Sequence, residues 1–554
     1  MIDLLLVHPP SYYYFREEKR VYGPIADVVP SSPVYDMYPY GFFSITYYLL
    51  KKGYKARIHN AAALMVLDES YRFEDYLRGI DAKLYGVDLH WLPHAHGALE
   101  VAKILKKIKG EVPVVLGGLS ASIFWAEILT KYDFVDYVLV GDTTEKSIEK
   151  LIMYIEGKGR LEDIEGLAYR EEGRVKLNPP RKPEPLLNEY KIDFNYLFKY
   201  ALTDDPLSFT PFSSFMNNPI GAVLVFKGCL YSCATCGGGR NTYMEYLGRD
   251  RVSFKTPDVV ADEILSINSW SRIPVFVIGD LQLVGGEKYA EALVKELREN
   301  GFDAPIYFEF FYPPPHGLLE KIIKASHTVY LQLSPETQDE FLRIKFGRQY
   351  NNTMLEKFIE RAHKLGFSRI DLYFMHGIPF QTMDVALKLP RYVENLYGQY
   401  KNSRIDVFVS PLAPFIDPGS PAFKYPFLYG YKLKAKTLSE HVDLISRSRT
   451  WVEMLNYESY YMSNTELAIA TAKTGLELLK IKARYGIIDE DIARKQIEVI
   501  ENYLESHGET IGIDKKIVVP FEELYETLDL GKLLRNPDEI SKILINITRF
   551  GENN

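Results

Sequence analysis

Three cysteines stand close together in this sequence, and the chain contains no others. Cys229, Cys233 and Cys236 lie in the segment CLYSCATCGGGR, directly after an apolar run, GAVLVFKG, that reads as a β-strand. This spacing lets one short loop place three thiolates around one face of an iron–sulfur cluster. Three ligands leave one iron of a [4Fe-4S] cube open, and an open metal position can bind a substrate or cosubstrate. The loop therefore predicts a reactive cluster.

Two other interpretations of the cysteines compete with the cluster. One is a structural zinc site with its fourth ligand elsewhere in the chain, and the other is simple buried cysteines. Zinc knuckles usually pair their ligands as CxxC, and buried cysteines do not gather in a polar, Gly-rich loop. Gly237 and Gly238, after the last cysteine, either supply N–H groups and backbone freedom beside a cluster or form a flexible turn.

The cysteine loop resembles that of the radical S-adenosylmethionine (SAM) superfamily, whose members carry CxxxCxxC after the first strand of a partial barrel. The resemblance implies that SAM chelates the open iron and that the reduced cluster cleaves it to a 5′-deoxyadenosyl radical. It further implies hydrogen abstraction from an unactivated carbon and a reductant protein such as ferredoxin or flavodoxin. The family normally has an aromatic residue where this chain has Thr235. Tyr231 is the substitute that we expect to pack against the adenine.

Further segments extend the resemblance across the barrel. Asp280 follows the second predicted strand, where the family carries an acidic segment that meets the SAM amino group. The segment LQLSPETQDEFLRIKFGR resembles the fourth-strand motif, which implies Glu336 near the ribose or amino group and Arg348 near the carboxylate. Without the resemblance these two would be a solvated charge pair. The segment HGIPFQT resembles the turn that lines the adenine, here with Gly377, Ile378 and Pro379.

The elements that must position these residues follow from hydrophobic periodicity. Up to about residue 157, short β-rich runs alternate with helical patterns, which predicts an α/β fold with a parallel sheet. The expected strands are Asp3–His8, Lys55–Asn60, Leu84–Leu89, Val112–Gly118 and Asp136–Gly141. We predict a Rossmann-like doubly wound domain, closed by a β-hairpin in GLAYREEGRVKLNPP.

The alternation resumes near Gly221 and continues to about Pro414. Six strand–helix repeats predict a partial (β/α)6 barrel whose loops meet at one carboxyl-terminal mouth. Its expected strands are Ala222–Lys227, Val275–Ile278, Ile306–Phe311, Val329–Leu333, Asp371–Phe374 and Asp406–Ser410. Apolar spacings of three and four predict a helical C-terminal region. The predicted domains are 1–180, a linker at 181–219, the barrel at 220–430 and the helical region at 431–554.

The N-terminal domain resembles the cobalamin-binding domain that precedes the barrel in a large radical SAM subfamily. The matching segments are HPP at residues 8–10, VVLGGLSAS and VLVGDTTE. Gly117 and Gly118 would let a flat ring approach the backbone, and Ser120 and Ser122 would hydrogen bond to it. Pro93 stands where an axial-histidine motif needs glycine, but members of this subfamily often bind cobalamin without that ligand. The resemblance leaves cobalamin binding open.

Charge and hydropathy exclude several classes of function. With 66 Lys plus Arg against 74 Asp plus Glu, the formal net charge is -8, which gives no broad basic field for nucleic acid. No apolar stretch approaches the roughly 18 residues of a transmembrane span. The N-terminus reads as a strand and not as a signal peptide, and three cysteines do not make a disulfide scaffold. We expect a cytoplasmic protein, or one bound peripherally to the membrane.

The overall pattern resembles archaeal cobalamin-domain radical enzymes, which include synthases that close rings in tetraether membrane lipids. It implies carbon–carbon bond formation on a hydrophobic substrate, with cobalamin-dependent C-methylation as the alternative. A cobalamin or iron–sulfur sensor is the alternative that is not an enzyme. Aromatic residues make up 14% of the chain. They suit either a hydrophobic tunnel or ordinary core packing.

Overall fold

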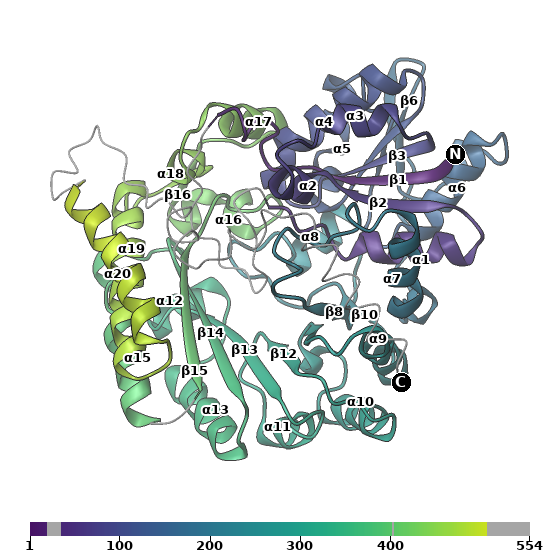
Figure 1. Ribbon diagram of the computed structural model, residues 1–554. Coiled ribbons are helices and arrows are strands. Elements are labelled where there is room, and N and C mark those ends of the chain that lie inside the picture. Colours follow the sequence, from purple (N-terminus) through teal and green to yellow (C-terminus); the bar gives the residue numbers. More distant parts are fainter. Residues whose placement is uncertain (19–34, 401–403, 507–554) are drawn as a thin grey trace.

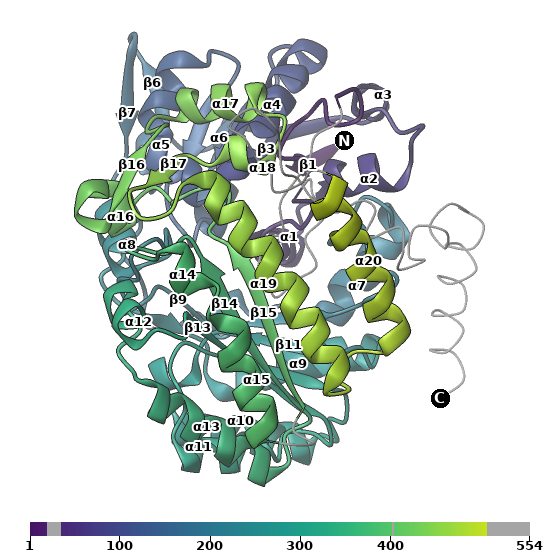
Figure 2. The ribbon, with the colours of Figure 1, turned by 90° about the vertical axis from the view of Figure 1, so that its left-hand side faces the viewer.

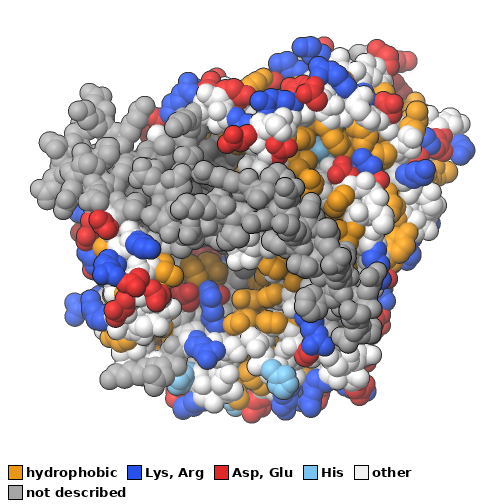
Figure 3. All heavy atoms as spheres, in the orientation of Figure 1, with side chains coloured by type: hydrophobic (Ala, Val, Ile, Leu, Met, Phe, Trp, Pro, Cys, Tyr) orange, Lys and Arg blue, Asp and Glu red, His pale blue; other side chains and the backbone are white. Residues whose placement is uncertain are grey.

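The structure is a computed structural model that describes residues 1–18, 35–400 and 404–506. An N-terminal α/β domain lies on top of a curved parallel sheet, and the C-terminal helices run along the side of both (Figures 1 and 2). In the described part of the chain, no helix combines the length and apolarity that a bilayer crossing requires. On the face that Figure 3 shows, charges of both signs are interspersed over the periphery.

The N-terminal domain is built on a seven-stranded sheet with the order β2-β1-β3-β4-β5-β6-β7. The first five strands in that order pair in parallel and the β6–β7 hairpin is antiparallel. The strands are β1 Ile2–His8, β2 Ala56–Asn60, β3 Ala82–Asp88, β4 Val114–Gly117, β5 Tyr137–Leu139, β6 Leu167–Glu171 and β7 Arg174–Leu177. The strand order reverses between β1 and β3, as in doubly wound folds. The predicted doubly wound domain is confirmed.

Helices cover both faces of this sheet (Figure 1). They are α1 Gly41–Lys51, α2 Ala61–Leu67, α3 Phe73–Arg78, α4 Ala95–Lys109, α5 Leu119–Lys131 and α6 Glu145–Ile155. Because both faces are buried, the inner strands are continuous apolar runs such as Leu4 to Val7, all at most 3% exposed.

The second domain is a six-stranded parallel sheet with the order β15-β14-β13-β12-β11-β8. The strands are β8 Gly221–Leu224, β11 Val275–Ile278, β12 Ile306–Phe310, β13 Val329–Glu336, β14 Arg369–His376 and β15 Ile405–Pro411. The helices that connect them are α9 Pro257–Trp270, α10 Glu287–Glu299, α11 His316–Ile322, α12 Glu340–Phe346, α13 Asn352–Leu365, α14 Met383–Ala386 and α15 Leu389–Gln399. The predicted partial barrel is confirmed.

The segment between the domains contains a helix that the sequence did not indicate. Helix α7 (Phe194–Asp204) is N-capped by Asp193, whose carboxylate accepts from the Tyr196 backbone N–H. Its residues Phe194 and Leu197 belong to the barrel core. Its buried residues are Phe194, Leu197, Phe198 and Ala201, which recur at the spacing of one helix face. The segment 181–219 therefore packs against both domains, because α7 joins the barrel core whereas Leu187 and Tyr190 belong to a core cluster of the N-terminal domain.

The C-terminal region is mainly helical but also contains one short antiparallel strand pair. Its elements are α16 Pro421–Lys424, the 3₁₀ turn η5 Pro426–Tyr429, β16 Tyr431–Leu433, α17 Leu438–Arg447, α18 Trp451–Met454, β17 Tyr457–Ser459, α19 Asn464–Arg484 and α20 Glu490–Ser506. Helix α19 runs along β15, while α17 binds α5 through the Glu127 carboxylate. The region thus joins both domains. The rest of the predicted helical region, 507–554, lies outside the described residues.

Candidate functional site

The cysteine loop leaves the barrel at the carboxyl end of β8 through the two-residue strand β9 (Phe226–Lys227). Gly228 has φ +92°, and a Cβ there would lie 2.9 Å from the Arg251 carbonyl oxygen, so only glycine fits this turn. The loop is then held from two sides. The Ala234 N–H donates to the Phe346 carbonyl at 2.7 Å, and the Ala422 N–H donates to the Ala234 carbonyl at 2.8 Å. The cysteine loop is therefore clamped between α12 and α16.

The three thiols fit an iron–sulfur cluster better than a zinc ion. Cys233 is buried, Cys229 is half-buried and Cys236 is exposed. Within the described residues, no three His, Cys, Asp or Glu side chains converge on the position of one metal ion. A cubane cluster needs no such convergence, because each cysteine binds a different iron. Burial raises the pKa of the Cys229 and Cys233 thiols, so cationic iron is a partner that would favour their thiolate forms.

Two glycines follow the last cysteine in the loop. The Gly237 N–H donates to the Asp417 carboxylate at 2.9 Å, and a Cβ at Gly237 would lie 2.7 Å from the Asp417 Cβ. A Cβ at Gly238 would lie 3.7 Å from the Cys236 Sγ. Gly237 is thus required by close packing, and Gly238 lies directly beside the thiol. Asp417, in the loop after β15, is a positioning residue that the sequence did not single out.

Glu336 and Arg348 form a buried ion pair beside the cysteine loop. Glu336 ends β13 with φ +65°, and its Oε1 accepts from the Arg348 Nη2 at 2.8 Å. Gly347 lies directly before the arginine and packs against the cysteine loop, where a Cβ would lie 3.0 Å from the Cys233 Cα. This close packing places Arg348 beside the loop. Burial raises the pKa of the Glu336 carboxyl, and the Arg348 guanidinium opposes that rise. The structure brings both residues to the cluster loop, and their contacts with SAM remain a prediction.

Asp280 is fully buried, and its carboxylate has several partners within the protein. It accepts from the backbone N–H groups of Gln282 and Phe311, both at 2.9 Å. Burial raises its pKa, and these two N–H groups oppose the rise. Asp280 thereby joins the loops that follow β11 and β12. Its predicted contact with the SAM amino group remains untested. Glu309, on the neighbouring strand β12, accepts a hydrogen bond from the Gly279 N–H at 3.0 Å. The sequence did not indicate this residue.

An aromatic wall connects Asp280 to the cysteine loop. Tyr231 stacks on Tyr312, with ring centroids 4.9 Å apart, and also meets the edge of Phe311. The Arg348 guanidinium lies 5.4 Å from the Phe311 ring centroid. One face of Tyr231 is therefore covered by Tyr312, and the adenine packing that the sequence predicts for Tyr231 stays a prediction.

The turn from Gly377 to Pro379 packs against the other side of the loop. Ile378 is fully buried in a cluster that includes Cys233. Gly377 has φ +86°, and its carbonyl accepts from the Tyr431 hydroxyl at 2.7 Å. A Cβ at Gly377 would lie 2.9 Å from the Tyr457 hydroxyl oxygen. The turn predicted to line the adenine thus lies beside the cysteines, backed by β16 and β17.

The N-terminal site residues lie at the carboxyl end of β4 and in the first turn of α5. A Cβ at Gly117 would meet open space, which suits a flat ring, whereas a Cβ at Gly118 would lie 2.5 Å from the His90 backbone. The Ser120 hydroxyl donates to the His90 carbonyl at 3.0 Å, and the Ser122 hydroxyl donates to the Gly118 carbonyl at 2.8 Å. The site therefore fits cobalamin at Gly117, while the two serines hold the surrounding loops together.

A buried pair also marks the switch point of the N-terminal sheet. His8 ends β1 and Asp88 ends β3, and the His8 Nδ1 lies 2.9 Å from the Asp88 carboxylate. Both side chains are at most 2% exposed. Ligands of open α/β sheets bind at the carboxyl ends of strands near such a switch point. The pair therefore lies at the expected ligand edge of this domain.

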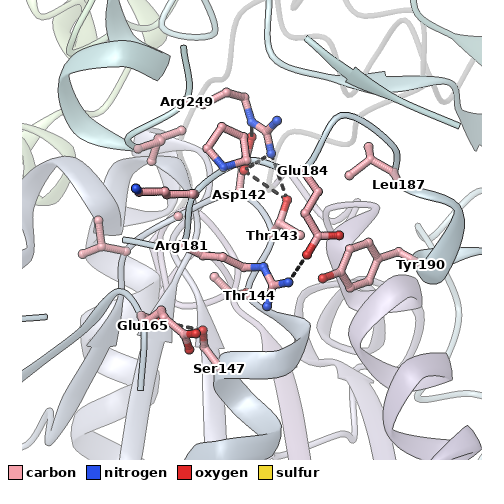
Figure 4. A pocket seen from close by; sticks show the side chains of 15 residues that line it. Asp142, Thr143, Thr144, Ser147, Glu165, Arg181, Glu184, Leu187, Tyr190 and Arg249 are labelled. Atoms are coloured by element: carbon pink, nitrogen blue, oxygen red, sulfur yellow. Dashed lines mark hydrogen bonds and ion pairs between the residues drawn. The ribbon is translucent and has the colours of Figure 1, made fainter. Parts of the chain in front are cut away.

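The loop after β5 binds the barrel instead of remaining free for a cofactor. The Arg249 guanidinium donates to both carboxylate oxygens of Asp142 and to the Thr143 hydroxyl (Figure 4). The Lys227 ammonium, two residues before Cys229, donates to the Asp142 carbonyl at 2.6 Å. We call Asp142, Lys227 and Arg249 the domain clamp. It connects the N-terminal domain to the strand that carries the cysteine loop.

Family models match both domains. Residues 27–149 match the B12 binding domain, and residues 223–389 match the Radical SAM superfamily. The fold is similar to that of the radical SAM methyltransferase TsrM from Kitasatospora setae, at a TM-score of 0.55 and 17% identity over 76% of this chain and 75% of that one. It is also similar to the cobalamin-dependent SAM radical enzyme OxsB, at a TM-score of 0.58 and 10% identity over 100% of this chain and 79% of that one.

Curated relatives match shorter stretches. An uncharacterized methyltransferase of Pyrococcus horikoshii is 29% identical over 26% of this chain and 28% of its own length. An anaerobic magnesium-protoporphyrin IX monomethyl ester cyclase of Synechocystis sp. is 22% identical over 33% of this chain and 34% of its own length. The matches thus span about a third or less of these relatives.

Proposed function

We propose, from the premise that this chain belongs to the radical SAM superfamily and carries a B12 binding domain, that it functionalises an unactivated carbon of an apolar substrate. One observation carries the proposal. The cysteine loop, the Glu336–Arg348 pair and the turn at Gly377 pack together at one mouth of the barrel. When bound, the cluster supplies the electron that cleaves SAM to methionine and a 5′-deoxyadenosyl radical.

The residues of this mouth divide the work of holding SAM. Arg348 offers a planar guanidinium that suits a carboxylate, and Glu336 both orients it and offers an acceptor to the amino group or ribose. Asp280 holds the neighbouring loops and offers a second acceptor. The backbone from Gly377 to Pro379 and the ring of Tyr231 enclose the adenine. Each of these roles is testable by SAM affinity without turnover.

For the substrate, we propose ring closure by carbon–carbon bond formation in an archaeal tetraether membrane lipid. Each closure forms one carbon–carbon bond and removes two hydrogen atoms from the chain. Two 5′-deoxyadenosyl radicals would take up these atoms, so two SAM molecules and two electrons from the reductant would yield two methionines and two 5′-deoxyadenosines per ring. Support comes from the resemblance to lipid ring synthases and from the apolar, aromatic surroundings of the mouth. Expression in an archaeon that makes ringless tetraethers, followed by lipid mass spectrometry, tests this proposal. Products lighter by two hydrogens per ring support it, and unchanged lipids contradict it.

C-methylation is the second candidate, favoured by the B12 binding domain and by the relatives named as methyltransferases. Cobalamin would act as the methyl carrier and would lie at Gly117, between the N-terminal domain and the barrel. Methylation yields S-adenosylhomocysteine and adds a methyl group to the product, whereas ring closure does neither. A sensor, the third possibility from the sequence, would form no 5′-deoxyadenosine.

We propose that ferredoxin or flavodoxin delivers the electron and that the enzyme works in the cytoplasm or at the inner membrane surface. The reductant is testable directly. Reduced ferredoxin or flavodoxin should replace dithionite as the electron source for 5′-deoxyadenosine formation. Failure of both carriers, with dithionite still effective, would contradict this choice of partner.

A further inference from the structure

Five large apolar and aromatic side chains gather on the outer surface of the C-terminal region. We call them the apolar rim: Tyr425, Phe427, Leu428, Tyr460 and Tyr461. Their exposed fractions range from 46% at Tyr461 to 77% at Phe427. Phe427 is the most exposed large apolar side chain in the described residues apart from the N-terminal Met1. Single exposed apolar residues are ordinary, but such a cluster needs an explanation.

The rim residues are held together by a small folded unit. Phe427 meets the edge of Tyr460, and the Tyr460 N–H donates to the Gly430 carbonyl at 2.9 Å. Gly430 has φ +80°, and a Cβ there would lie 2.6 Å from the Tyr461 ring. This turn therefore needs glycine, and it fixes η5 against the end of β17. The exposure of Phe427 and Leu428 follows from an ordered turn.

The same unit forms the outer wall of the proposed SAM site. Tyr429, the residue after Leu428, packs into the cluster that includes Cys233 and Ile378. Tyr461 meets the edge of Phe380, which follows the turn from Gly377 to Pro379. Within one 3₁₀ turn, two side chains thus point outward and the next points to the cysteine loop. Whatever covers the rim lies next to the mouth of the barrel.

The charge of the segment around the apolar rim indicates which kind of partner covers the rim. Residues 418–439 contain four lysines and no Asp or Glu, with aromatic residues in between: the sequence is PGSPAFKYPFLYGYKLKAKTLS. Glu245 and Glu458 from neighbouring elements pair with Lys424 and Lys432. Lys436 stays exposed, and no ion pair to its ammonium occurs among the described residues. Aromatic side chains with interleaved lysines suit the boundary between lipid headgroups and acyl chains.

We propose that the apolar rim docks the enzyme on a lipid bilayer, with Phe427 and Leu428 inserted among the acyl chains. The inference rests on the proposed lipid substrate and deepens it, because it states where the substrate's own membrane meets the barrel. Apolar insertion dominates the binding and the lysines add a smaller attraction to anionic headgroups, since two of the four are already paired. Binding should therefore occur on zwitterionic vesicles and increase modestly on anionic ones.

Co-sedimentation of the full-length holoenzyme with sucrose-loaded vesicles tests this inference. The vesicles are phosphatidylcholine, alone or mixed with phosphatidylglycerol. The double variant F427S/L428S should lower the partition coefficient about tenfold or more, because it removes the inserted apolar groups. The control Y196S/L207S replaces an exposed aromatic and an exposed aliphatic side chain on and after α7, at 49% and 47% exposure, and should bind like the wild type.

A second variant keeps the test independent of any folding defect. F427W places an indole on the rim, and its emission should shift to shorter wavelength when vesicles are added, in a difference spectrum against the wild type. A wild-type protein that ignores both vesicle types, or a rim variant that binds as well as the control, overturns the proposal. Dimerisation of the wild type that F427S/L428S abolishes, without vesicle binding, would instead identify the rim as an interface between copies and would also overturn it.

The outcomes separate this inference from the proposed function. Vesicle binding needs no turnover, and 5′-deoxyadenosine formation needs no vesicle. Rings formed from detergent-dispersed lipid by a protein that binds no vesicle would refute the docking surface alone. Rim-dependent vesicle binding by a protein that closes no rings would refute the proposed substrate reaction alone.

Discussion

Arg249 donates two hydrogen bonds to Asp142 across the boundary between the domains, at 2.5 and 2.9 Å. The arginine lies between the cysteine loop and α9, and the aspartate lies after β5 of the N-terminal domain. Planar two-point contacts of this kind fix orientation as well as distance. The domain clamp therefore holds the N-terminal domain in its position against the barrel.

Breaking the clamp should loosen the two domains without emptying the cluster site. D142N leaves the Arg249 guanidinium, which is 3% exposed, without its anion, at a cost of about 2–5 kcal/mol. Limited proteolysis should then cleave the segment 181–219 faster, while iron content stays unchanged. D250N is the matched control, because Asp250 is exposed and pairs with the neighbouring Arg251. Equal cleavage rates for D142N and the wild type would refute the clamp.

An added side chain should lower the stability of the protein at Gly118 but should affect only cobalamin binding at Gly117. G118A forces a Cβ to within 2.5 Å of the His90 backbone at φ +112°, so the melting temperature should fall by several degrees, as for a loss of about 1–3 kcal/mol. G117L adds a side chain into open space, so the melting temperature should hold while cobalamin binding is lost. Retained cobalamin binding in G117L would argue against the site at β4.

The Glu336–Arg348 pair should control SAM affinity and not cluster assembly. R348A removes the guanidinium that we propose for the SAM carboxylate, so the dissociation constant for SAM should rise tenfold or more, about 1.4 kcal/mol per factor of ten. Equilibrium dialysis with reconstituted protein measures it, with iron content recorded in parallel. R348K should recover part of the affinity, and E340Q, on the exposed start of α12, should match the wild type. An unchanged dissociation constant in R348A would remove Arg348 from the SAM site.

Burial at the barrel floor should make stability depend on pH. Desolvation raises the pKa of the Asp371 carboxyl from 3.8 to about 6, against the opposing charge of Arg369. Because the folded state holds this proton more tightly than the unfolded state, the contribution to stability is present below about pH 4 and is lost as pH rises through about 6. D371N should remove up to about 3 kcal/mol of that dependence, as denaturant melts at several pH values would show. If D371N showed the same dependence of the unfolding free energy on pH between about 4 and 6 as the wild type, this role of Asp371 would be contradicted.

The sheets and the cluster loop were predictable because local patterns determine them. Parallel strands buried on both faces are continuous apolar runs, and the three cysteines occupy one loop directly after such a run. Helix α7 and the β16–β17 pair were not predicted, because short amphipathic segments depend on the surfaces they meet. The C-terminal strands, three residues each, are ordered by contacts between Tyr431, Tyr457 and the turn at Gly377.

The long-range contacts of the site were beyond the sequence for a different reason. Asp142 and Arg249 are 107 positions apart, and nothing local marks them as partners. Ser120 and Ser122 looked free to bind a cofactor, but a short hydroxyl side chain often bonds to nearby backbone carbonyls, as both do in this structure. Asp417 acts through the backbone N–H of Gly237, a contact that only the assembled barrel creates.

The central claim is that Cys229, Cys233 and Cys236 hold a cluster that turns SAM into a radical source. The most direct measurement is 5′-deoxyadenosine formation by anaerobically reconstituted protein with dithionite and SAM, with metal content determined on the same sample. We predict about four irons per chain and product from the wild type, and neither from the variant with all three cysteines changed to Ala. Zinc in place of iron, or a full iron complement without 5′-deoxyadenosine, would contradict the account.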